Sequence, residues 1–363
     1  MYKDDFLQKR LAERSDMNLL RKLPAVHNGW VDFSSNDYLG IATQHLLHPS
    51  KGLEHSSKGS RLLAGNYSLI EEAEQLIANF QEADAALIFN SGYDANVGLL
   101  SSIANREDTF IFDALSHASI RDGIRLSVAK SFSFQHNNIE DLEKKISKAT
   151  GNIFIVTETV FSMDGDECPL KEIITIATKY KAHIILDEAH ATGVVGDRGE
   201  GLAQSLKVHS SIFARVHTFG KACGAHGAVI LGSLQLKSFL VNYARSFIYT
   251  TALPESSVEC IIQSYRLFPS MVAERKQLAA YIQQFQTANL RYKKLNSLSA
   301  IQGVIVPGNT PVKELATLLQ KNNFDIRPIL SPTVPEGSER LRIVLHSFNT
   351  QNELDELIRL LSK

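Results

Sequence analysis

A lysine lies among small residues directly after an apolar run of the sequence. The run Ile212–Val216 leads into segment 217–227, in which Gly220 and Gly224 flank Lys221. Because glycine leaves space around its neighbours, Lys221 can lie in a pocket that lowers its pKa, and such a lysine can form a Schiff base with a carbonyl compound. The GxxxxGK[ST] pattern of a nucleotide-binding P-loop is not present around it. Taken by itself, the segment also fits a surface loop with a solvated lysine.

An acid and a histidine follow a second apolar run. Asp187 and His190 come directly after Ile184–Leu186. A carboxylate at the end of a buried strand needs a partner, because burying an unpaired charge is costly. Three interpretations stay open: both residues bind a metal ion, Asp187 forms an ion pair with a cofactor, or Asp187 caps a helix, which is worth about 1 kcal/mol.

A third run ends in a turn that suits a phosphate group. Ala85–Phe89 precedes segment Ser91–Tyr93, and the residues after Gly92 are expected to begin a helix. The N-terminus of a helix presents free N–H groups and a partial positive charge, and a glycine there lets a ligand approach the backbone closely. An ordinary strand-to-helix turn accounts for the same residues.

Two further runs end near acids and a histidine. The run Ile153–Val156 is followed by a serine and three acids: Glu158, Ser162, Asp164 and Asp166. Closely spaced acids can bind calcium, but no complete EF-hand loop follows, so a solvated acidic loop is the better expectation for Asp164 and Asp166. His117 follows Thr109–Phe112. It is a candidate functional residue only together with the other residues, because a lone histidine is more often structural than catalytic.

Together these residues match the needs of one cofactor. Pyridoxal 5'-phosphate requires a lysine for its aldehyde, a carboxylate opposite its protonated pyridine nitrogen, a cradle for its phosphate and a flat group over its ring. Those four roles fit, in this order, Lys221, Asp187, segment Ser91–Tyr93 and His117. The carboxylate would keep the ring nitrogen protonated and thereby maintain the cofactor as an electron sink.

The elements that must position these residues alternate along the chain. Helical stretches at 71–81, 138–148 and 170–180 separate short β-rich runs, which predicts an α/β protein with a mostly parallel sheet and ligands at the carboxyl ends of its strands. The expected strands are Ala85–Phe89, Thr109–Phe112, Ile153–Thr157, His183–Leu186, Ile212–Val216 and Ala228–Leu231.

From about residue 255 the pattern changes. A long helix is expected over 256–290 with a break or kink at Pro269, then strands and a last helix near 351–362. The later strands are Ile301–Val306, Asp325–Arg327 and Arg340–Leu345. We therefore predict an N-terminal segment at 1–45, a large cofactor-binding domain at 46–255 and a smaller C-terminal α+β domain at 256–363.

Composition excludes several classes of protein. The 363 residues carry 38 Lys and Arg against 39 Asp and Glu, a net charge of −1, which argues against a nucleic-acid or anionic-membrane binder. No window reaches the roughly 18 consecutive apolar residues of a membrane span, and the acidic start lacks the apolar run of a signal peptide. Three scattered cysteines make a disulfide framework or a structural zinc site improbable, and no metal is expected. These features favour a cytoplasmic protein.

From about residue 10 to the C-terminus the chain resembles the α-oxoamine synthases, a family of fold-type I pyridoxal-phosphate enzymes. The motifs that carry the resemblance are 34–40, 117–119, 157–165, 187–190, 191–193 and 218–221. The resemblance implies a fold-type I architecture and a homodimer. It also implies a decarboxylating condensation of L-alanine with pimeloyl-CoA or a pimeloyl-carrier protein, with no nucleic acid or membrane as partner.

The resemblance also implies roles for individual residues. Lys221 would hold the cofactor and move protons at the substrate's α-carbon, Asp187 would pair with the pyridine nitrogen, and His117 would stack on the ring and help to place the thioester. The other implied cofactor contacts are Ser91, Gly92, Tyr93, Glu158, Ser162, His190 and Thr218, with Thr250 or Thr251 reaching the phosphate of the partner subunit. The implied substrate contacts are Arg342 for the amino-acid carboxylate, Asn36 beside it and Arg21 for the acyl substrate.

Two positions depart from the family's pattern, and other functions stay open. His226 and His346 stand where relatives often carry other residues, so both are candidates to border the substrate pocket. The alternatives are a sister enzyme (glycine C-acetyltransferase, 5-aminolevulinate synthase or serine palmitoyltransferase), a metal-dependent hydrolase that uses Asp187, His190 and an acid from Asp164–Asp166, and a non-catalytic binding module. The hydrolase would leave Lys221 and its flanking glycines unexplained.

Overall fold

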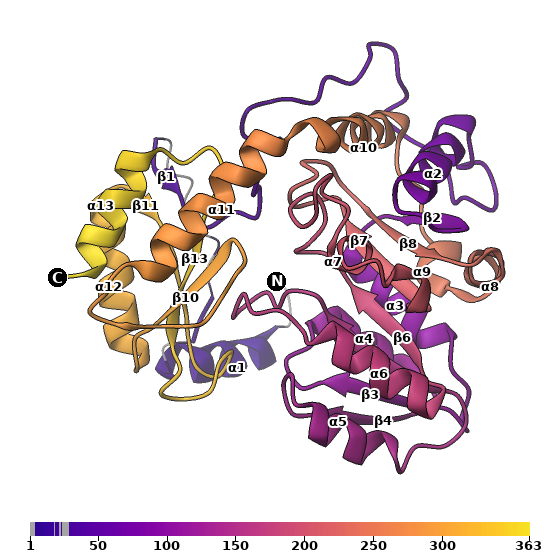
Figure 1. The fold of residues 1–363 in the computed structure, drawn as a ribbon, viewed down its shortest axis with the longest axis horizontal. Helices are drawn as coiled ribbons and strands as arrows, with labels where there is room; N and C mark the ends of the chain where they lie inside the picture. Colours follow the sequence, from indigo (N-terminus) through magenta and orange to yellow (C-terminus); the bar gives the residue numbers. More distant parts are fainter. Residues whose placement is uncertain (1–3, 18, 22, 24–28) are drawn as a thin grey trace. The chain divides into compact units, whose positions relative to one another are not determined.

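The centre of the chain is a seven-stranded sheet, seen in Figure 1 of the computed structural model. Across the sheet the strands are β2 (Ala85–Phe89), β8 (Ala228–Gly232), β7 (Ala214–Thr218), β6 (His183–Asp187), β5 (Ile153–Glu158), β3 (Thr109–Asp113) and β4 (Lys130–Phe134). Only β8 runs antiparallel to its neighbours, and the other six strands run parallel to one another. The predicted parallel arrangement is therefore confirmed.

Two details of this sheet differ from the prediction. The edge strand β4 is absent from the predicted strands, because four of its five side chains are exposed and only Phe134 is buried, so it lacks an apolar run. Strand β7 begins at Ala214 and not at Ile212, and a 3-10 turn (His209–Ser211) ends directly before Ile212.

Helices cover both faces of the sheet, which explains why its strands read as apolar runs. In β6, Ile184 and Leu186 pack into one hydrophobic cluster while Ile185 packs into another on the opposite face, as the two-residue period of a strand requires. The helices of this region are α2 (Ser68–Phe80), α3 (Gly92–Ser102), α4 (Ala118–Leu126), α5 (Ile139–Ile146), α6 (Leu170–Tyr180), α7 (Leu202–Ser205), α8 (Leu234–Tyr243) and α9 (Arg245–Ile248).

A smaller antiparallel sheet follows in the C-terminal part, orange to yellow in Figure 1. Its strand order is β12 (Arg327–Ile329), β13 (Arg340–Val344), β10 (Ile301–Ile305) and β9 (Lys293–Lys294). The remaining elements are α10 (Glu255–Leu267), α11 (Val272–Thr287), α12 (Asn309–Lys321), α13 (Gln351–Leu361), β1 (Val31–Asp32) and β11 (Phe324–Asp325).

The predicted break at Pro269 is confirmed, because a 3-10 turn at Phe268–Ser270 separates α10 from α11. The predicted strand Asp325–Arg327 is wrong: the chain forms two short strands there, β11 and β12. Strand β11 pairs with β1 in a sheet of its own, whereas β12 pairs with β13.

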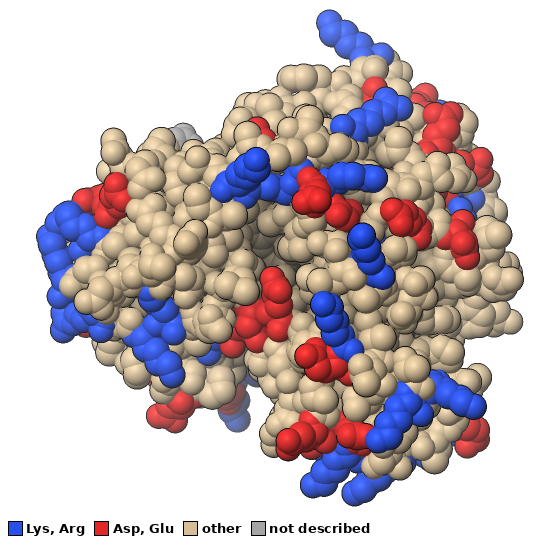
Figure 2. All heavy atoms as spheres, in the orientation of Figure 1, with Lys and Arg blue, Asp and Glu red and all other residues tan. Residues whose placement is uncertain are grey.

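The structure describes residues 4–17, 19–21, 23 and 29–363, which divide into two units at residues 30 and 31. The first unit contains α1 (Asp5–Asp16), and the second contains all the elements above. The domain limits at 45 and 255 stay a prediction. Basic and acidic side chains are interspersed on the face seen in Figure 2. Within the described ranges, no helix combines the length and apolarity needed to cross a membrane.

Gly165 offers a test of how the two larger sheets pack, because it lies in the loop after β5 and contacts the C-terminal part. Its φ is +76°, and a Cβ there would collide with the carbonyl oxygen of Ile301. We expect Gly165→Ala to lower the free energy of unfolding by about 2–4 kcal/mol, the sum of left-handed strain and overpacking.

Gly337 is the matched control for urea unfolding of this variant. Its φ is +81°, but a Cβ at this position would have no neighbouring atom within 4 Å. Gly337→Ala should therefore cost only the strain, about 1–2 kcal/mol. Equal losses in the two variants would contradict the close packing at Gly165.

Candidate active site

Polar side chains line up at one edge of the large sheet. Four neighbouring parallel strands end in Thr218, Asp187, Glu158 and Asp113, in this order across the sheet. Beside them lies a pocket of about 270 Å³. Its lining includes Asn36, Ser91, Gly92, Tyr93, Asn96, His117, Ser119, Glu158, Asp187, His190, Thr218, Lys221 and His226. Most of the residues predicted to bind one ligand are thus neighbours in space.

Lys221 begins a hydrogen-bonded chain that crosses this pocket. Its Nζ lies 2.9 Å from Nε2 of His190, whose Nδ1 lies 2.6 Å from the hydroxyl of Tyr38. The Tyr38 hydroxyl in turn donates to Oδ1 of Asn36. Because a charged lysine can only donate, His190 accepts at Nε2 and carries its proton on Nδ1. The chain orients both Lys221 and His190.

The surroundings of Lys221 favour a reactive amine. Burial lowers its pKa to about 8, against the opposing effect of the Asp187 and Glu158 carboxylates. Burial and the charge of Lys221 also hold the pKa of His190 well below its usual range, so this imidazole is neutral. A lysine with a lowered pKa offers a larger fraction of free amine for attack on a carbonyl carbon.

Asp187 is held at the floor of the pocket by two donors. Its Oδ2 accepts from Nδ2 of Asn96 at 2.8 Å, and its Oδ1 accepts from the backbone amide of Ala189 at 2.9 Å. The side chain is 6% exposed, and its partners fix its position without neutralising its charge. Sequence analysis missed Asn96, which lies four residues after Gly92 and therefore on the same face of α3.

The N-terminus of α3 offers free amides to the same pocket. Ser91 caps this helix, since its hydroxyl accepts from the amide of Asp94. The amides of Gly92 and Tyr93 come earlier and have no acceptor within the helix. A Cβ on Gly92 would lie 2.5 Å from Cγ2 of Thr218, so a glycine keeps this approach open.

Glu158 and His117 form the opposite side of the pocket. The backbone amide of His117 donates to Oε1 of Glu158 at 2.6 Å, and the His117 ring is exposed toward solvent. Burial and the charge of Asp187, its register neighbour on β6, raise the pKa of Glu158 to about 8. The raised pKa favours the protonated form of Glu158.

Arg342, on strand β13 of the smaller sheet, lies outside the pocket lining but contacts Asn36, which belongs to it. Its Nε donates to the carbonyl of Ser162 at 2.7 Å, and its Nη2 donates to Oδ1 of Asn36 at 2.9 Å. The same Asn36 oxygen accepts from Tyr38, so the hydrogen-bonded chain connects Arg342 with His190 and Lys221. Sequence analysis missed Tyr38, although it lies in the motif of Asn36.

Several predicted residues lie outside the pocket lining. Ser162 contributes its carbonyl to Arg342, while Thr250 and the Thr251 carbonyl both accept from Nδ2 of Asn90. Arg21 is exposed and belongs to the N-terminal unit. His226 does line the pocket, whereas His346 is fully buried against Ser35 and Asn349. The roles of these residues stay predictions.

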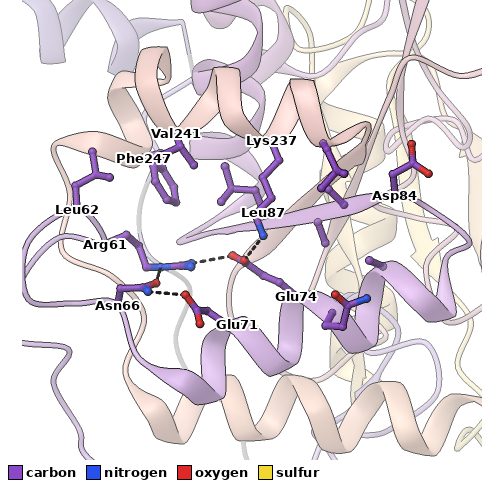
Figure 3. A pocket seen from close by; sticks show the side chains of 15 residues that line it. Arg61, Leu62, Asn66, Glu71, Glu74, Asp84, Leu87, Lys237, Val241 and Phe247 are labelled. Atoms are coloured by element: carbon purple, nitrogen blue, oxygen red, sulfur yellow. Dashed lines mark hydrogen bonds and ion pairs between the residues drawn. The ribbon is translucent and has the colours of Figure 1, made fainter.

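A larger cavity of about 410 Å³ lies elsewhere in the chain (Figure 3). The Glu74 carboxylate inside it binds Nη1 of Arg61 and Nζ of Lys237, each at 2.8 Å. All three charges are thus engaged with one another, and Lys237 comes from helix α8 and not from a strand end. This cavity lacks the arrangement that makes Lys221 reactive.

The donors expected for a metal are also engaged. Both oxygens of Asp187 and both ring nitrogens of His190 have the partners given above. In the part of the chain that the structure describes, no group of three or more His, Cys, Asp or Glu residues is arranged to hold a metal ion. The geometry offers no support for the hydrolase alternative.

Comparison with known proteins identifies the family. The model of the family "Aminotransferase class I and II" matches residues 28–361. An 8-amino-7-oxononanoate synthase of Emericella nidulans is 38% identical, over 98% of this chain and 94% of that protein. The chain belongs to the aminotransferase class I and II family, and within it to the 8-amino-7-oxononanoate synthases.

Solved structures of related enzymes have the same fold. The 8-amino-7-oxononanoate synthase of Francisella tularensis has a TM-score of 0.76 and 27% identity, over 93% of this chain and 98% of that one. A serine palmitoyltransferase of S. paucimobilis, with a PLP–myriocin aldimine bound, has a TM-score of 0.87 and 25% identity, over 99% and 96% of the two chains. The predicted fold class is confirmed.

The raised pKa of Glu158 predicts a pH dependence of stability. Between about pH 5 and 8 the folded protein keeps a proton that the unfolded chain has lost, so the free energy of unfolding falls as pH rises through this window. Glu158→Gln has no carboxyl group to titrate at this position. Its free energy of unfolding, measured in urea, should therefore fall less between pH 5 and 8. Glu140→Gln, at an exposed helical position, is the control. An unchanged pH dependence in Glu158→Gln would contradict the assignment.

Proposed function

We propose that this chain is a pyridoxal-phosphate-dependent acyltransferase that makes 8-amino-7-oxononanoate, a step of biotin biosynthesis. L-alanine and a pimeloyl thioester condense, and carbon dioxide and the free thiol leave. The observation that carries the proposal is one pocket with three features: a lysine of lowered pKa, a fixed buried carboxylate and the free amides of a helix N-terminus. The named relatives of the chain support the same reaction.

The residues of the pocket suit this cofactor. Lys221 would hold its aldehyde carbon, and Asp187 would face its protonated pyridine nitrogen, for which a carboxylate fixed by Asn96 is a suitable partner. The amides of Gly92 and Tyr93, with the Thr218 hydroxyl, would hold its phosphate. His117 would stack on its ring, with Glu158, Ser162 and His190 near its phenolic side.

Pyridoxal phosphate supplies an electron sink for charge that develops on the α-carbon of the amino acid. The chain supplies the rest. The freed amine of Lys221 takes the proton from the α-carbon of L-alanine, and the neutral His190 keeps that amine in place. Arg342 and Asn36 hold the carboxylate of L-alanine, because a planar guanidinium matches two carboxylate oxygens. His117 and Arg21 are the candidates to place the acyl thioester.

The active form is proposed to be a homodimer. Large apolar side chains are exposed near the segment of Thr250 and Thr251, with Leu63 87% and Tyr249 72% exposed. The backbone amide of Ala252 donates to the carbonyl of Gly59, which ties this segment to the loop of Leu63 beside the cavity of Figure 3. A second copy that covers this surface would bring the two threonines to its phosphate. Light scattering tests the proposal, and an active monomer contradicts it.

A cytoplasmic location belongs to the same proposal. It is supported by the three cysteines, Cys168, Cys223 and Cys260, which are all free thiols. Free thiols are usual in reducing compartments.

A product assay tests the reaction. Purified protein with pyridoxal phosphate, L-alanine and pimeloyl-CoA should release free thiol and give 8-amino-7-oxononanoate by mass spectrometry. Glycine and L-serine with acetyl-, succinyl- and palmitoyl-CoA cover the sister reactions. Lys221→Ala should abolish the product. Product from a sister pair alone would contradict the proposed substrates, and product from Lys221→Ala would contradict the proposed mechanism.

Arg342 should decide the affinity for L-alanine. We expect Arg342→Ala to weaken L-alanine binding about ten- to a hundredfold, since a charged hydrogen-bond pair is worth about 1.5–3 kcal/mol. Arg342→Lys should weaken it less, and cofactor affinity should change little in both variants. Spectral titration of the cofactor-loaded protein with L-alanine measures these constants.

Arg327→Ala is the matched control for this titration. Arg327 is the register partner of Arg342 on β12 and forms its ion pair with Asp325. Its removal should leave L-alanine affinity unchanged. An unchanged dissociation constant in Arg342→Ala would move the carboxylate-binding role to another residue.

A further inference from the structure

One more histidine near the carboxyl edge of the large sheet has no part in the mechanism above. His136 lies in the turn between β4 and α5, two residues after β4 ends. Its Nδ1 lies 2.9 Å from Oδ1 of Asp113, and its Nε2 lies 2.7 Å from Oδ2 of Asp166. His136 thus bridges two carboxylates from segments far apart in the sequence.

The geometry requires a charged imidazole. Both ring nitrogens face carboxylate oxygens, so both must donate, and only the imidazolium does so. Burial alone would lower the pKa of His136, but the hydrogen bonds and charges of Asp113 and Asp166 outweigh it and raise the pKa to about 10. The bridge is therefore intact at neutral pH.

The neighbours of His136 reinforce the bridge. The ring contacts Phe161 edge-on, with centroids 4.4 Å apart. Asn137 donates its backbone amide to Asp113 and its side-chain amide to Asp166, so two consecutive residues bind both acids. Asp113 is fully buried, so this cluster differs from an ion pair on the solvent-exposed surface.

One of the bridged segments leads to His117. Asp113 ends β3, and its carboxylate accepts from the amide of Leu115 at 2.7 Å. Two residues later the amide of His117 donates to Glu158. The bridge therefore lies at the base of the turn that carries His117.

The other bridged segment, the loop 159–167, holds the arginines of the smaller sheet. Arg342 donates to the carbonyl of Ser162, and Arg340 forms an ion pair with Asp164. On the same loop, Gly165 accepts from the Ser297 hydroxyl at 2.8 Å. Loop 159–167 is thus fixed by His136 from one sheet and contacts the other sheet through Ser162, Asp164 and Gly165.

We propose that His136 is a positioning residue for the amino-acid substrate. By joining Asp113 to Asp166 it fixes loop 159–167, so that the Ser162 carbonyl orients the Arg342 guanidinium toward the substrate's carboxylate. His136 itself touches neither substrate nor cofactor in this account. The inference rests on the proposed function, which gives Arg342 its role.

Hydrogen exchange, substrate binding and steady-state kinetics of His136→Gln and His136→Ala test this proposal. Hydrogen–deuterium exchange should show faster exchange in residues 159–167 than in the wild type. Titration of the cofactor-loaded protein should show L-alanine binding weakened about tenfold, because a misplaced orienting group costs far more than its own contacts. The KM for L-alanine should rise likewise, while the KM for the acyl thioester and the affinity for pyridoxal phosphate change little. A purely structural role would instead raise both KM values and weaken the binding of pyridoxal phosphate together.

Glu167→Gln is the matched control. It neutralises the next acid of the loop and keeps the Glu167 carbonyl, which accepts from Asn137. Asp166→Asn removes one charge of the bridge at nearly constant shape and should have the same effect as His136→Gln. It is the variant to measure if the His136 variants fail to fold. Unchanged exchange in loop 159–167 would overturn the inference whatever the substrate is. Faster exchange with unchanged L-alanine binding would also overturn it, whereas a wild type that binds no L-alanine would count against the proposed function.

Discussion

Three carboxylates lie side by side at the carboxyl edge of the large sheet, and the rest of the site depends on how they are accommodated. Asp113, Glu158 and Asp187 end three neighbouring parallel strands and are almost completely buried. Three adjacent negative charges in such a place repel one another, so each needs a different solution. His136 forms an ion pair with the first, a raised pKa favours the protonated form of the second, and Asn96 and Ala189 donate hydrogen bonds to the third. Asp187 lines the pocket and Asp113 does not, so Asp187 is the carboxylate placed to face a cationic ring.

The second constraint is the joint between the two larger sheets. The amino acid must be held by its carboxylate from one sheet while Lys221 acts on it from the other, and an error of about 1 Å can cost about a hundredfold in rate. Loop 159–167 and the segment of Asn36 and Tyr38 meet at Arg342, which donates to both. The hydrogen-bonded chain from Arg342 through Asn36, Tyr38 and His190 to Lys221 gives the carboxylate-binding and proton-transfer groups one shared geometry.

The sequence alone predicted that the residues directly after the strands lie together at one edge of the sheet. Lys221, Asp187 and Gly92 each follow an apolar run, and parallel strands must bring such ends to one edge. Asn96, Tyr38 and His136 could not be predicted in this way, because their roles depend on which strands are neighbours and how loops fold over the edge. His136 in particular follows β4, whose side chains face solvent on an edge strand and therefore leave no apolar run to recognise. The prediction gave one strand where the structure has two short strands within 324–329. The reason is similar, because the pairing partners and not the local residues decide where each strand begins.

The most direct test of this account is chemical identification of the lysine that holds the cofactor. The protein is incubated with pyridoxal phosphate, reduced with borohydride, digested and mapped by mass spectrometry. The account predicts a single phosphopyridoxyl modification, on the peptide that contains Lys221. A modification of Lys237 in the cavity of Figure 3, or of any other lysine with Lys221 unmodified, would contradict it.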